Sequence, residues 1–327
     1  MSDWQVQIKN LNKQPLLCQF ISLLNRMKID FSSKPVQWVT LILLAFTWGS
    51  SFILMKRGLD SFAPEEVAAY RVFIVFVCLL PFSFKELNLL KGTKGAALAS
   101  VGIFGSALPY FLFIVAQTKI ASSMNGILNS LTPLFTLIFA FLFFGQRFKA
   151  LSILGVILGL TGATGLIYFG TDDKSALTFT WFTILPVIAS ARYGFNANLI
   201  KMYLQKVKPL QVTALSFLFV GPAAGVYLFA GTDFLLHLNG VEAWKNFGYI
   251  NILGIVGTAL AVWIFNMLIK ETSALFASSV TYMIPIVAIM WGLLDGEVLH
   301  FWQWVSTGVI LLAVSLINSK RRFKKTL

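Results

Sequence analysis

Apolar stretches of roughly 20 residues, long enough to cross a bilayer as helices, recur ten times along this 327-residue chain. They are continuously apolar, which favours helices over the alternating strands of a membrane barrel. Charged residues make up only 12% of the chain, so the composition excludes a soluble enzyme and a disordered chain. We expect an all-α integral membrane protein. The predicted spans are 36–55, 67–84, 95–116, 122–144, 151–169, 179–200, 209–230, 247–269, 274–294 and 301–318.

The basic residues indicate how these spans are threaded. Most of the 26 Lys and Arg residues lie on the segments that share a side with both termini. The loops on the other side carry only Lys56, Arg57, Lys119, Lys174 and Lys245. Because Lys and Arg collect on the cytoplasmic side, both termini are predicted to be cytoplasmic, in a plasma membrane, or the inner membrane of a cell with two. The net charge of +13 then reflects topology, and no nucleic-acid partner is expected.

The second half of the chain repeats motifs of the first half in the same order. GIFGSAL at 102–108 returns as GIVGTAL at 254–260, and the dipeptide Trp48-Gly49 is matched by Tyr193-Gly194. Five spans in each copy invert the second copy in the bilayer, which is the architecture of alternating access. The alternative is that duplication only built a stable ten-helix bundle.

This repetition defines the expected domains. They are a basic cytoplasmic extension at 1–35, five-helix repeats at 36–169 and 179–318, and a basic cytoplasmic tail at 319–327. The sequence assigns no role to the extension.

Several of these motifs resemble one known repeat. The stretches WGSSF at 48–52, PEEVAAYR at 64–71, TPL at 132–134 and IPI at 284–286 are similar to the EamA repeat of the drug/metabolite transporter superfamily, over residues 38–318. Gln146 departs from the pattern, because the family usually has a Glu after the glycine, as at Glu297. The resemblance implies a ten-helix permease for small metabolites, often amino acids or related solutes moving outward.

Charged residues inside the predicted spans are few. No Asp or Glu lies away from the span ends, which disfavours proton-coupled extrusion of cations. An Arg near a helix centre costs about 2.5 to 3.5 kcal/mol, so Arg71 and Arg192 should face an aqueous cavity or a partner. Arg71 has a structural alternative, in which it reaches the outer headgroups or pairs with Glu65 or Glu66, and Arg192 could bond to backbone carbonyls. The functional hypothesis is that they hold a substrate carboxylate or phosphate.

Uncharged polar and aromatic residues complete the candidate substrate site. Ser122, Asn125, Asn129 and Thr132 share one helical face, which predicts either interhelical hydrogen bonds or a pore lining. The candidate substrate-binding residues are Trp48, Ser51, Arg71, Tyr110, Asn125, Asn129, Arg192, Tyr193, Asn196, Trp263, Asn266, Ser278 and Thr281. The candidate hinges are Gly49, Pro133, Gly194 and Pro285.

The leading hypothesis is a permease that exports an amino acid or related carboxylate-bearing solute by alternating access. Its expected partners are a small-molecule substrate and the lipid bilayer. No catalytic residue, cofactor or metal is expected, and the sequence leaves the oligomeric state open, a monomer being compatible with it. The alternatives are an exchanger of nucleotide sugars or phosphorylated metabolites, a membrane-embedded enzyme, and a scaffold that does not transport.

Overall fold

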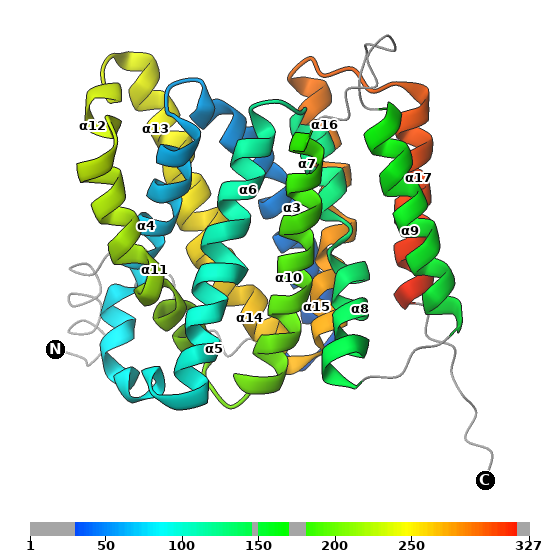
Figure 1. Ribbon diagram of the computed structural model, residues 1–327, viewed down its shortest axis with the longest axis horizontal. Helices are drawn as coiled ribbons and strands as arrows, with labels where there is room; N and C mark the ends of the chain where they lie inside the picture. Colours follow the sequence, from blue (N-terminus) through cyan, green and yellow to red (C-terminus); the bar gives the residue numbers. More distant parts are fainter. Residues whose placement is uncertain (1–29, 146–149, 170–180, 319–327) are drawn as a thin grey trace, which may run out of the picture.

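The computed structural model describes residues 30–145, 150–169 and 181–318, and regular structure within these ranges is helical throughout. The helices run side by side in one bundle (Figure 1). Within the described residues, seven stretches are long and apolar enough to cross a membrane, so the chain is a multi-pass membrane protein. They are Lys34–Leu59, Pro64–Ser83, Gly92–Gln117, Ser122–Phe144, Pro209–Gly231, Val241–Glu271 and Ala274–Leu294.

Each apolar run predicted as a span is mainly helical over its described residues. The first half contains α3 (Lys34–Leu59), α4 (Pro64–Ser83), η1 (Phe84–Leu90), α5 (Gly92–Gly102), η2 (Ile103–Ala107), α6 (Leu108–Gln117), α7 (Ser122–Asn129), α8 (Thr132–Phe144) and α9 (Ala150–Phe169). The second half contains η3 (Trp181–Thr183), α10 (Ile184–Tyr203), α11 (Pro209–Gly231), α12 (Phe234–His237), α13 (Val241–Gly254), η4 (Ile255–Leu260), α14 (Ala261–Glu271), α15 (Ala274–Ser278), η5 (Ser279–Tyr282), α16 (Ile284–Leu294) and α17 (Phe301–Asn318). The N-terminal residues 1–29, Gln146 and the tail at 319–327 lie outside the described ranges.

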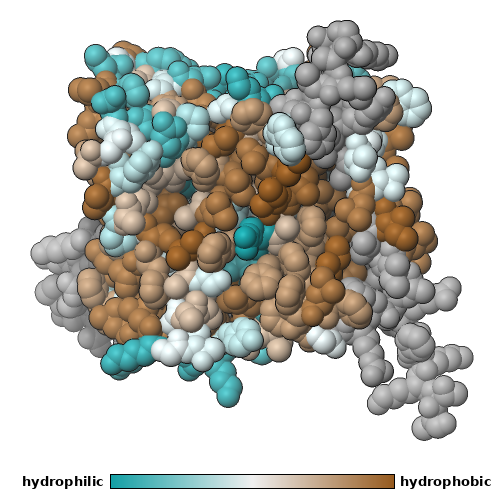
Figure 2. Space-filling view, in the orientation of Figure 1, coloured by the Kyte–Doolittle hydropathy of each residue, from teal (hydrophilic) through white to brown (hydrophobic). Residues whose placement is uncertain are grey.

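The two ends of the bundle are named here by a lysine at each. The Lys56 face, at the top of Figure 1, holds the end of α3, the start of α4, and α12. The Lys201 face, at the bottom, holds the turn from α10 to α11 and the turn from α14 to α15, and α17 ends there. Hydrophilic side chains gather at both faces, and hydrophobic ones dominate the belt between them (Figure 2). This distribution fits a protein whose middle is solvated by lipid.

Equivalent residues mark the starts and ends of helices in the two halves. Pro64 and Pro209 lie at the start of α4 and α11, where a missing backbone N–H costs nothing. Gly145 and Gly296 lie just after α8 and α16, with φ of 64° and 84°, a backbone conformation that other residues rarely adopt. The same local signals therefore stop and start equivalent helices.

Two close helix pairs organise the bundle. Helix α4 packs along α11, and α9 packs along α17. In the first pair, Gly221 and Gly225 admit the rings of Phe76 and Phe73, since a Cβ at either glycine would overlap them. The pair α4 and α11 thereby brings equivalent stretches of the two halves side by side.

In the described chain, four interruptions break the helices, and they form two pairs that are equivalent between the halves. The π-helical segments η2 and η4 separate α5 from α6 and α13 from α14. Ser130 and Leu131 separate α7 from α8, and η5 separates α15 from α16. The sequence predicted each of these stretches as one span, because a hydropathy pattern registers the length and apolar content of a run and not its local hydrogen-bond pattern. Such interruptions free backbone groups and recur at functional sites in membrane transporters.

Candidate functional site

A cavity of about 920 Å³, part of it open to solvent, is lined by both halves of the chain. Its polar lining residues are Ser51, Arg71, Ser106, Tyr110, Asn129, Thr132, Tyr193, Asn196, Thr213, Ser216, Asn266, Ser278 and Thr281. Its larger apolar lining residues are Trp48, Phe52, Met55, Val101, Phe113, Ile200, Phe217, Val262 and Phe265. No Asp or Glu of the described chain lines it. The cavity is therefore mostly apolar with a few polar groups, as solute sites generally are.

Arg71 supplies the one charged group of this lining. Its side chain is buried, its Nε donates to Thr258 Oγ1 at 2.7 Å, and its Cζ lies 3.9 Å from the centroid of the Tyr110 ring. Among the described residues, no carboxylate lies within 4.0 Å of the guanidinium. The cation is thus held by a hydroxyl and an aromatic face, both uncharged.

The pair with Glu65 or Glu66 that was predicted as a structural alternative for Arg71 is wrong. Glu66 Oε2 accepts instead from the backbone N–H of Ala63 at 2.9 Å and lies 2.9 Å from His237 Nδ1. Helix α4 starts at Pro64, so Glu66 reaches back to the free N–H groups of the first turn, where a carboxylate is favoured. Arg71 lies further along the helix and is left facing the cavity.

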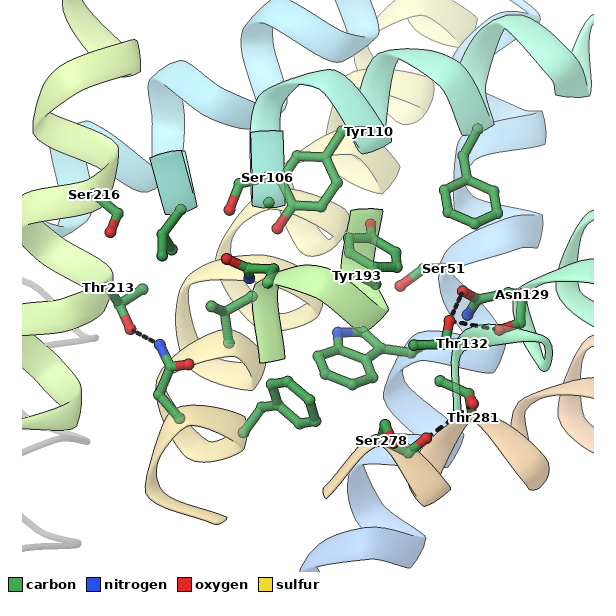
Figure 3. Close-up of a pocket in the computed structure, with 18 of the residues that line it drawn as sticks. Ser51, Ser106, Tyr110, Asn129, Thr132, Tyr193, Thr213, Ser216, Ser278 and Thr281 are labelled. Carbon is green, nitrogen blue, oxygen red and sulfur yellow. Dashed lines mark hydrogen bonds between the residues drawn. The ribbon is translucent and has the colours of Figure 1, made fainter. Parts of the chain in front are cut away.

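Helix breaks position four of the polar groups. Asn129 and Thr132 flank the break between α7 and α8, and Ser278 and Thr281 flank the start of η5. Thr132 Oγ1 donates to the Asn129 carbonyl at 2.8 Å, and Thr281 Oγ1 donates to the Ser278 carbonyl at 2.9 Å. These four lie on one wall, and Thr213 and Ser216 lie on the opposite wall (Figure 3). The equivalent breaks of the two halves thus meet at one cavity.

The π-helical segments position the aromatic wall. Trp48 Nε1 donates to the carbonyl of Gly257, inside η4, at 2.9 Å, and its ring packs edge-on against Phe265 with centroids 5.1 Å apart. A Cβ at Gly257 would lie 3.0 Å from Ser51 Oγ. In the other half, a Cβ at Gly105, inside η2, would lie 2.3 Å from the Asn196 side chain. Each glycine therefore lets the first helix of the opposite half approach the π-helical segment.

Two buried polar atoms in the wall have no hydrogen-bond partner among the described residues. They are Ser216 Oγ and Asn266 Oδ1, on residues that are 0% and 2% exposed. Asn266 Nδ2 donates to Thr213 Oγ1 at 2.9 Å, which leaves the amide oxygen free. A buried polar atom without a partner costs about 1–3 kcal/mol, so the cavity offers unsatisfied acceptors.

Most of the predicted substrate-binding residues lie together in the cavity. They are Trp48, Ser51, Arg71, Tyr110, Asn129, Tyr193, Asn196, Asn266, Ser278 and Thr281. Met55, Phe265, Ser106, Thr132, Thr213 and Ser216 also line it and were not predicted as site residues. The repeat itself could have found Ser216, because it lies 145 residues after Arg71 and is its equivalent in the second half.

Arg192 is placed outside the cavity. It is exposed on α10, with its Cζ 5.2 Å from the centroid of the Phe104 ring. The rotation of α10 is fixed by Gly194, where a Cβ would lie 2.5 Å from the backbone nitrogen of Thr136 in α8. Since Arg192 lies two residues earlier, it points to the opposite side of the helix.

Asn125 and Trp263 also lie outside the lining. Asn125 Nδ2 donates to the Phe113 carbonyl at 2.9 Å and to Gln117 Oε1 at 3.0 Å, which ties α7 to α6. Trp263 packs in an apolar cluster around Phe217, and its neighbour Val262 lines the cavity instead. Interhelical hydrogen bonding, the other use predicted for the polar face of 122–132, thus accounts for Asn125.

The predicted hinge residues lie at close helix crossings and at breaks. A Cβ at Gly49 would lie 2.5 Å from Val287 of α16, and one at Gly194 would lie 2.8 Å from the Phe135 backbone of α8. Pro133 and Pro285 lie in the first turns of α8 and α16, directly after the breaks. Movement about these residues stays a prediction.

An ionic cluster lies at the Lys56 face. Lys56 Nζ lies 2.5 Å from Asp295 Oδ2 and 3.5 Å from Glu297 Oε1, and Arg57 also pairs with Asp295. Glu297 accepts from the backbone N–H groups of Ser122 and Ser123 at 2.9 and 3.1 Å and from the Ser122 hydroxyl at 2.6 Å. Burial opposes ionisation of Glu297, but these hydrogen bonds outweigh it and lower its pKa below the usual 4.5.

At the Lys201 face the equivalent lysine meets carbonyl oxygens instead of carboxylates. Lys201 Nζ donates to the carbonyls of Ile269, Lys270 and Thr272 at 3.0, 3.1 and 2.7 Å, at the end of α14. A smaller cavity of about 210 Å³ lies beside this lysine and shares Ile200 and Asn266 with the main cavity. The main cavity therefore extends toward the Lys201 face.

Curated relatives of the chain are named as transporters. It is 28% identical over 284 residues to the uncharacterized inner membrane transporter YedA of Escherichia coli, covering 85% of this chain and 89% of that protein. It is 23% identical to an uncharacterized transporter of Archaeoglobus fulgidus, covering 87% and 99%. A solved structure described only as a crystal structure of protein has a TM-score of 0.61 at 14% identity, covers 88% of this chain and 97% of that one, and shows the fold alone.

The EamA-like transporter family matches the chain twice, at residues 37–168 and 180–319. These matches cover most of the chain and agree with the two stretches in which the sequence motifs repeat. The mostly apolar cavity, the helix breaks around it and the relatives all fit a membrane transporter. The chain belongs to the EamA-like transporter family.

Proposed function

We propose that the chain is a ten-helix permease that exports an amino acid or related carboxylate-bearing solute by alternating access. The observation that carries this proposal is Arg71, a buried cation in the cavity wall with no acidic partner among the described residues. A guanidinium binds a carboxylate through two parallel hydrogen bonds, and such a bond is strong where water is excluded. The solute would supply the negative charge that the cavity lacks.

Equivalent contacts in the two halves support the inverted repeat and the alternating mechanism. Gly49 of α3 meets Val287 of α16, and Gly194 of α10 meets Phe135 of α8. The glycines lie 145 residues apart and their partners 152, so each half makes the same crossing with the other half. Two equivalent crossings can exchange shapes, which would open the central cavity to one face and then to the other.

The aromatic wall supports a solute with an apolar side chain. Trp48 is held by its hydrogen bond to Gly257 and packs against Phe265, and Phe52 and Phe113 contact each other with ring centroids 5.8 Å apart. Rings fixed in this way provide a large contact area at low cost in conformational entropy. We assign the Lys56 face to the outside of the cell, in agreement with the basic inner loops predicted from the sequence.

The test is uptake of radiolabelled L-phenylalanine and L-leucine into proteoliposomes loaded with the same unlabelled solute. Arg71→Gln should lower the initial rate at least about tenfold, the equivalent of 1.4 kcal/mol, because it removes the charge that holds the carboxylate. Arg71→Lys should retain part of the rate. The matched control is Arg192→Gln, an identical change outside the cavity, which should leave the rate within about twofold of the unmodified protein.

Two outcomes would overturn the proposal. One is equal uptake by Arg71→Gln and the unmodified protein. The other is flux of lipophilic cations with none of any carboxylate-bearing solute.

Exchange of a phosphorylated metabolite or nucleotide sugar is a second candidate function, because a guanidinium binds phosphate as well as carboxylate. Strict exchange separates the two. Uptake of a labelled phosphorylated sugar that needs the same solute inside the vesicle would favour the exchanger.

A further inference from the structure

Arg71 and its equivalent in the second half differ in chemistry. The equivalent residue is Ser216, 145 residues later, and both line the cavity from the packed helices α4 and α11. One position carries a buried cation and the other a buried hydroxyl whose oxygen has no partner. The two halves therefore present different groups to the same cavity, a cation from α4 and an uncharged hydroxyl that can accept a hydrogen bond from α11.

A chain of hydrogen bonds fixes the orientation of the Asn266 amide beside this hydroxyl. Thr213 Oγ1 donates to the Pro209 carbonyl at 3.1 Å, which uses its hydrogen. The same oxygen can then only accept from Asn266, and Asn266 Nδ2 donates to it at 2.9 Å. The NH₂ group of Asn266 must therefore point toward Thr213, and its Oδ1 must point away from Thr213. This oxygen, like Ser216 Oγ, has no protein partner.

We propose that Ser216 and Asn266, with Thr213 as the orienting residue, form an uncharged subsite for the hydrogen-bond-donating end of the solute, its ammonium group. The proposal rests on the proposed function and narrows its substrate class from carboxylate-bearing solutes to zwitterions. Amide and hydroxyl oxygens accept from an ammonium group without adding negative charge. A carboxylate in their place would give the cavity its own counter-charge to Arg71, whereas uncharged acceptors leave Arg71 available to the solute.

The unpartnered oxygens of Ser216 and Asn266 explain why the amino group of the solute should contribute to binding as well as its carboxylate. An ammonium group would satisfy acceptors that are otherwise buried without a partner, and a solute lacking it would leave them so. A site built to hydrogen-bond a substrate group discriminates strongly against the analogue that lacks this group, because its own buried atoms are then unpaired. Selectivity should therefore depend on the amino group as well as on the carboxylate.

The experiment compares pairs of competitors that differ only in the amino group. Uptake of labelled L-phenylalanine is inhibited with unlabelled L-phenylalanine or 3-phenylpropanoate, and uptake of labelled L-leucine with unlabelled L-leucine or 4-methylpentanoate. In the unmodified protein the amino acid should compete at least about tenfold better than its deaminated analogue, as expected for hydrogen bonds to a charged group. Competition reports affinity even where an analogue crosses the bilayer by itself.

The variants assign this preference to the subsite. Asn266→Leu should reduce the preference to about threefold or less, and Ser216→Ala should reduce it by a smaller factor. The matched control is Asn246→Leu. Asn246 is also buried, has an unpartnered Oδ1 and donates its Nδ2 to a hydroxyl, that of Ser61 at 2.8 Å, but it lies outside the cavity. Its replacement should leave the preference unchanged.

The outcomes separate this proposal from the proposed function. Equal competition by an amino acid and its deaminated analogue in the unmodified protein overturns the ammonium subsite and leaves carboxylate transport standing. A preference that survives in both Asn266→Leu and Ser216→Ala also overturns it. Absence of uptake for every carboxylate-bearing solute overturns the proposed function, and the subsite with it. Where a variant folds poorly, its competition ratio still reports on the fraction that transports.

Discussion

The two faces of the bundle carry equivalent lysines that have different partners. Lys56 and Lys201 lie 145 residues apart, near the ends of the first long helix of each half. Lys56 meets two carboxylates, Asp295 and Glu297, whereas Lys201 meets three carbonyl oxygens at the end of α14. The same residue type therefore forms ion pairs with carboxylates at one face and hydrogen bonds to the carbonyls of a helix terminus at the other.

The difference predicts unequal resistance to opening. A carbonyl cluster at a helix end carries only a partial negative charge, worth typically about 0.3–1 kcal/mol to a nearby cation. At the Lys56 face the carboxylates are nine-tenths buried, so their pairs are less screened by solvent than ordinary surface pairs. The smaller cavity beside Lys201 agrees with a looser closure on that side. We therefore expect the Lys56 face to be the harder one to open.

The largest expected effect comes from Glu297→Gln. The change removes the charge that Lys56 and the N–H groups at the start of α7 share, so the Lys56 face should open more often. The measurement is the labelling rate of Phe52→Cys by a membrane-impermeant maleimide added at that face, with Cys18 and Cys78 replaced by serine. The rate should rise about tenfold or more, as for loss of charge-assisted hydrogen bonds.

Asp60→Asn is the control for this prediction. Asp60 pairs with Arg57 at 3.6 Å on the same face, but both side chains are exposed, so its loss should change the rate less than about twofold. Equal acceleration by both variants would mean that Glu297 has no special part in closure.

A smaller effect is expected from the matched pair Lys56→Met and Lys201→Met. Lys56→Met leaves Asp295 paired with Arg57, so labelling of Phe52→Cys should rise about fivefold to tenfold. Lys201→Met should raise labelling of Ile200→Cys from the other face only about twofold to threefold, because it loses contacts with partial charges. A larger effect at the Lys201 face would reverse the comparison.

The smallest expected effect is that of mild acid. The pKa of Glu297 lies below its usual 4.5, so the stability that its ionised form contributes is fully present above pH 4.5 and is lost as the pH falls through the lowered pKa. Between pH 7.5 and 4.5, iodide quenching of a fluorophore attached beforehand at Phe52→Cys should therefore change less than about twofold. A steep rise between pH 6 and 5 would show that another group controls this closure.

Helix positions were predictable from the sequence because the length of each apolar run directly indicates the length of its helix. The runs predicted at 122–144, 274–294 and 301–318 have the bounds that the structure has, and the others differ by a few residues at their ends. Pro133 and Pro285, predicted as hinges, lie directly after the breaks inside 122–144 and 274–294. The π-helical segments inside 95–116 and 247–269 were not predictable. The glycines and alanines of GIFGSAL suit an α-helical or a π-helical turn equally, and the crossing of the opposite half selects the latter.

The rotation of each helix limited prediction of the site. A run that is apolar on all sides has no periodicity to indicate which face lies inward, so Arg192 and Asn196 looked equally suitable. A close backbone contact at Gly194 decides between them, and this contact depends on α8, far away in sequence. Asn125 shows the same limit, because its spacing matches Asn129 but its amide is taken by α6.

The uncompensated charge of Arg71 has an electrical consequence for the proposed cycle. An empty cavity carries one positive charge. When the site turns from one compartment to the other, the membrane potential changes the free energy of this charge by up to about 2.3 kcal/mol per 100 mV. A potential that is negative inside favours presentation of the empty site to the cytoplasm. A bound monoanion cancels the charge and the bias, whereas a zwitterion keeps both. Measuring transport against voltage would therefore count the net charge of the cargo.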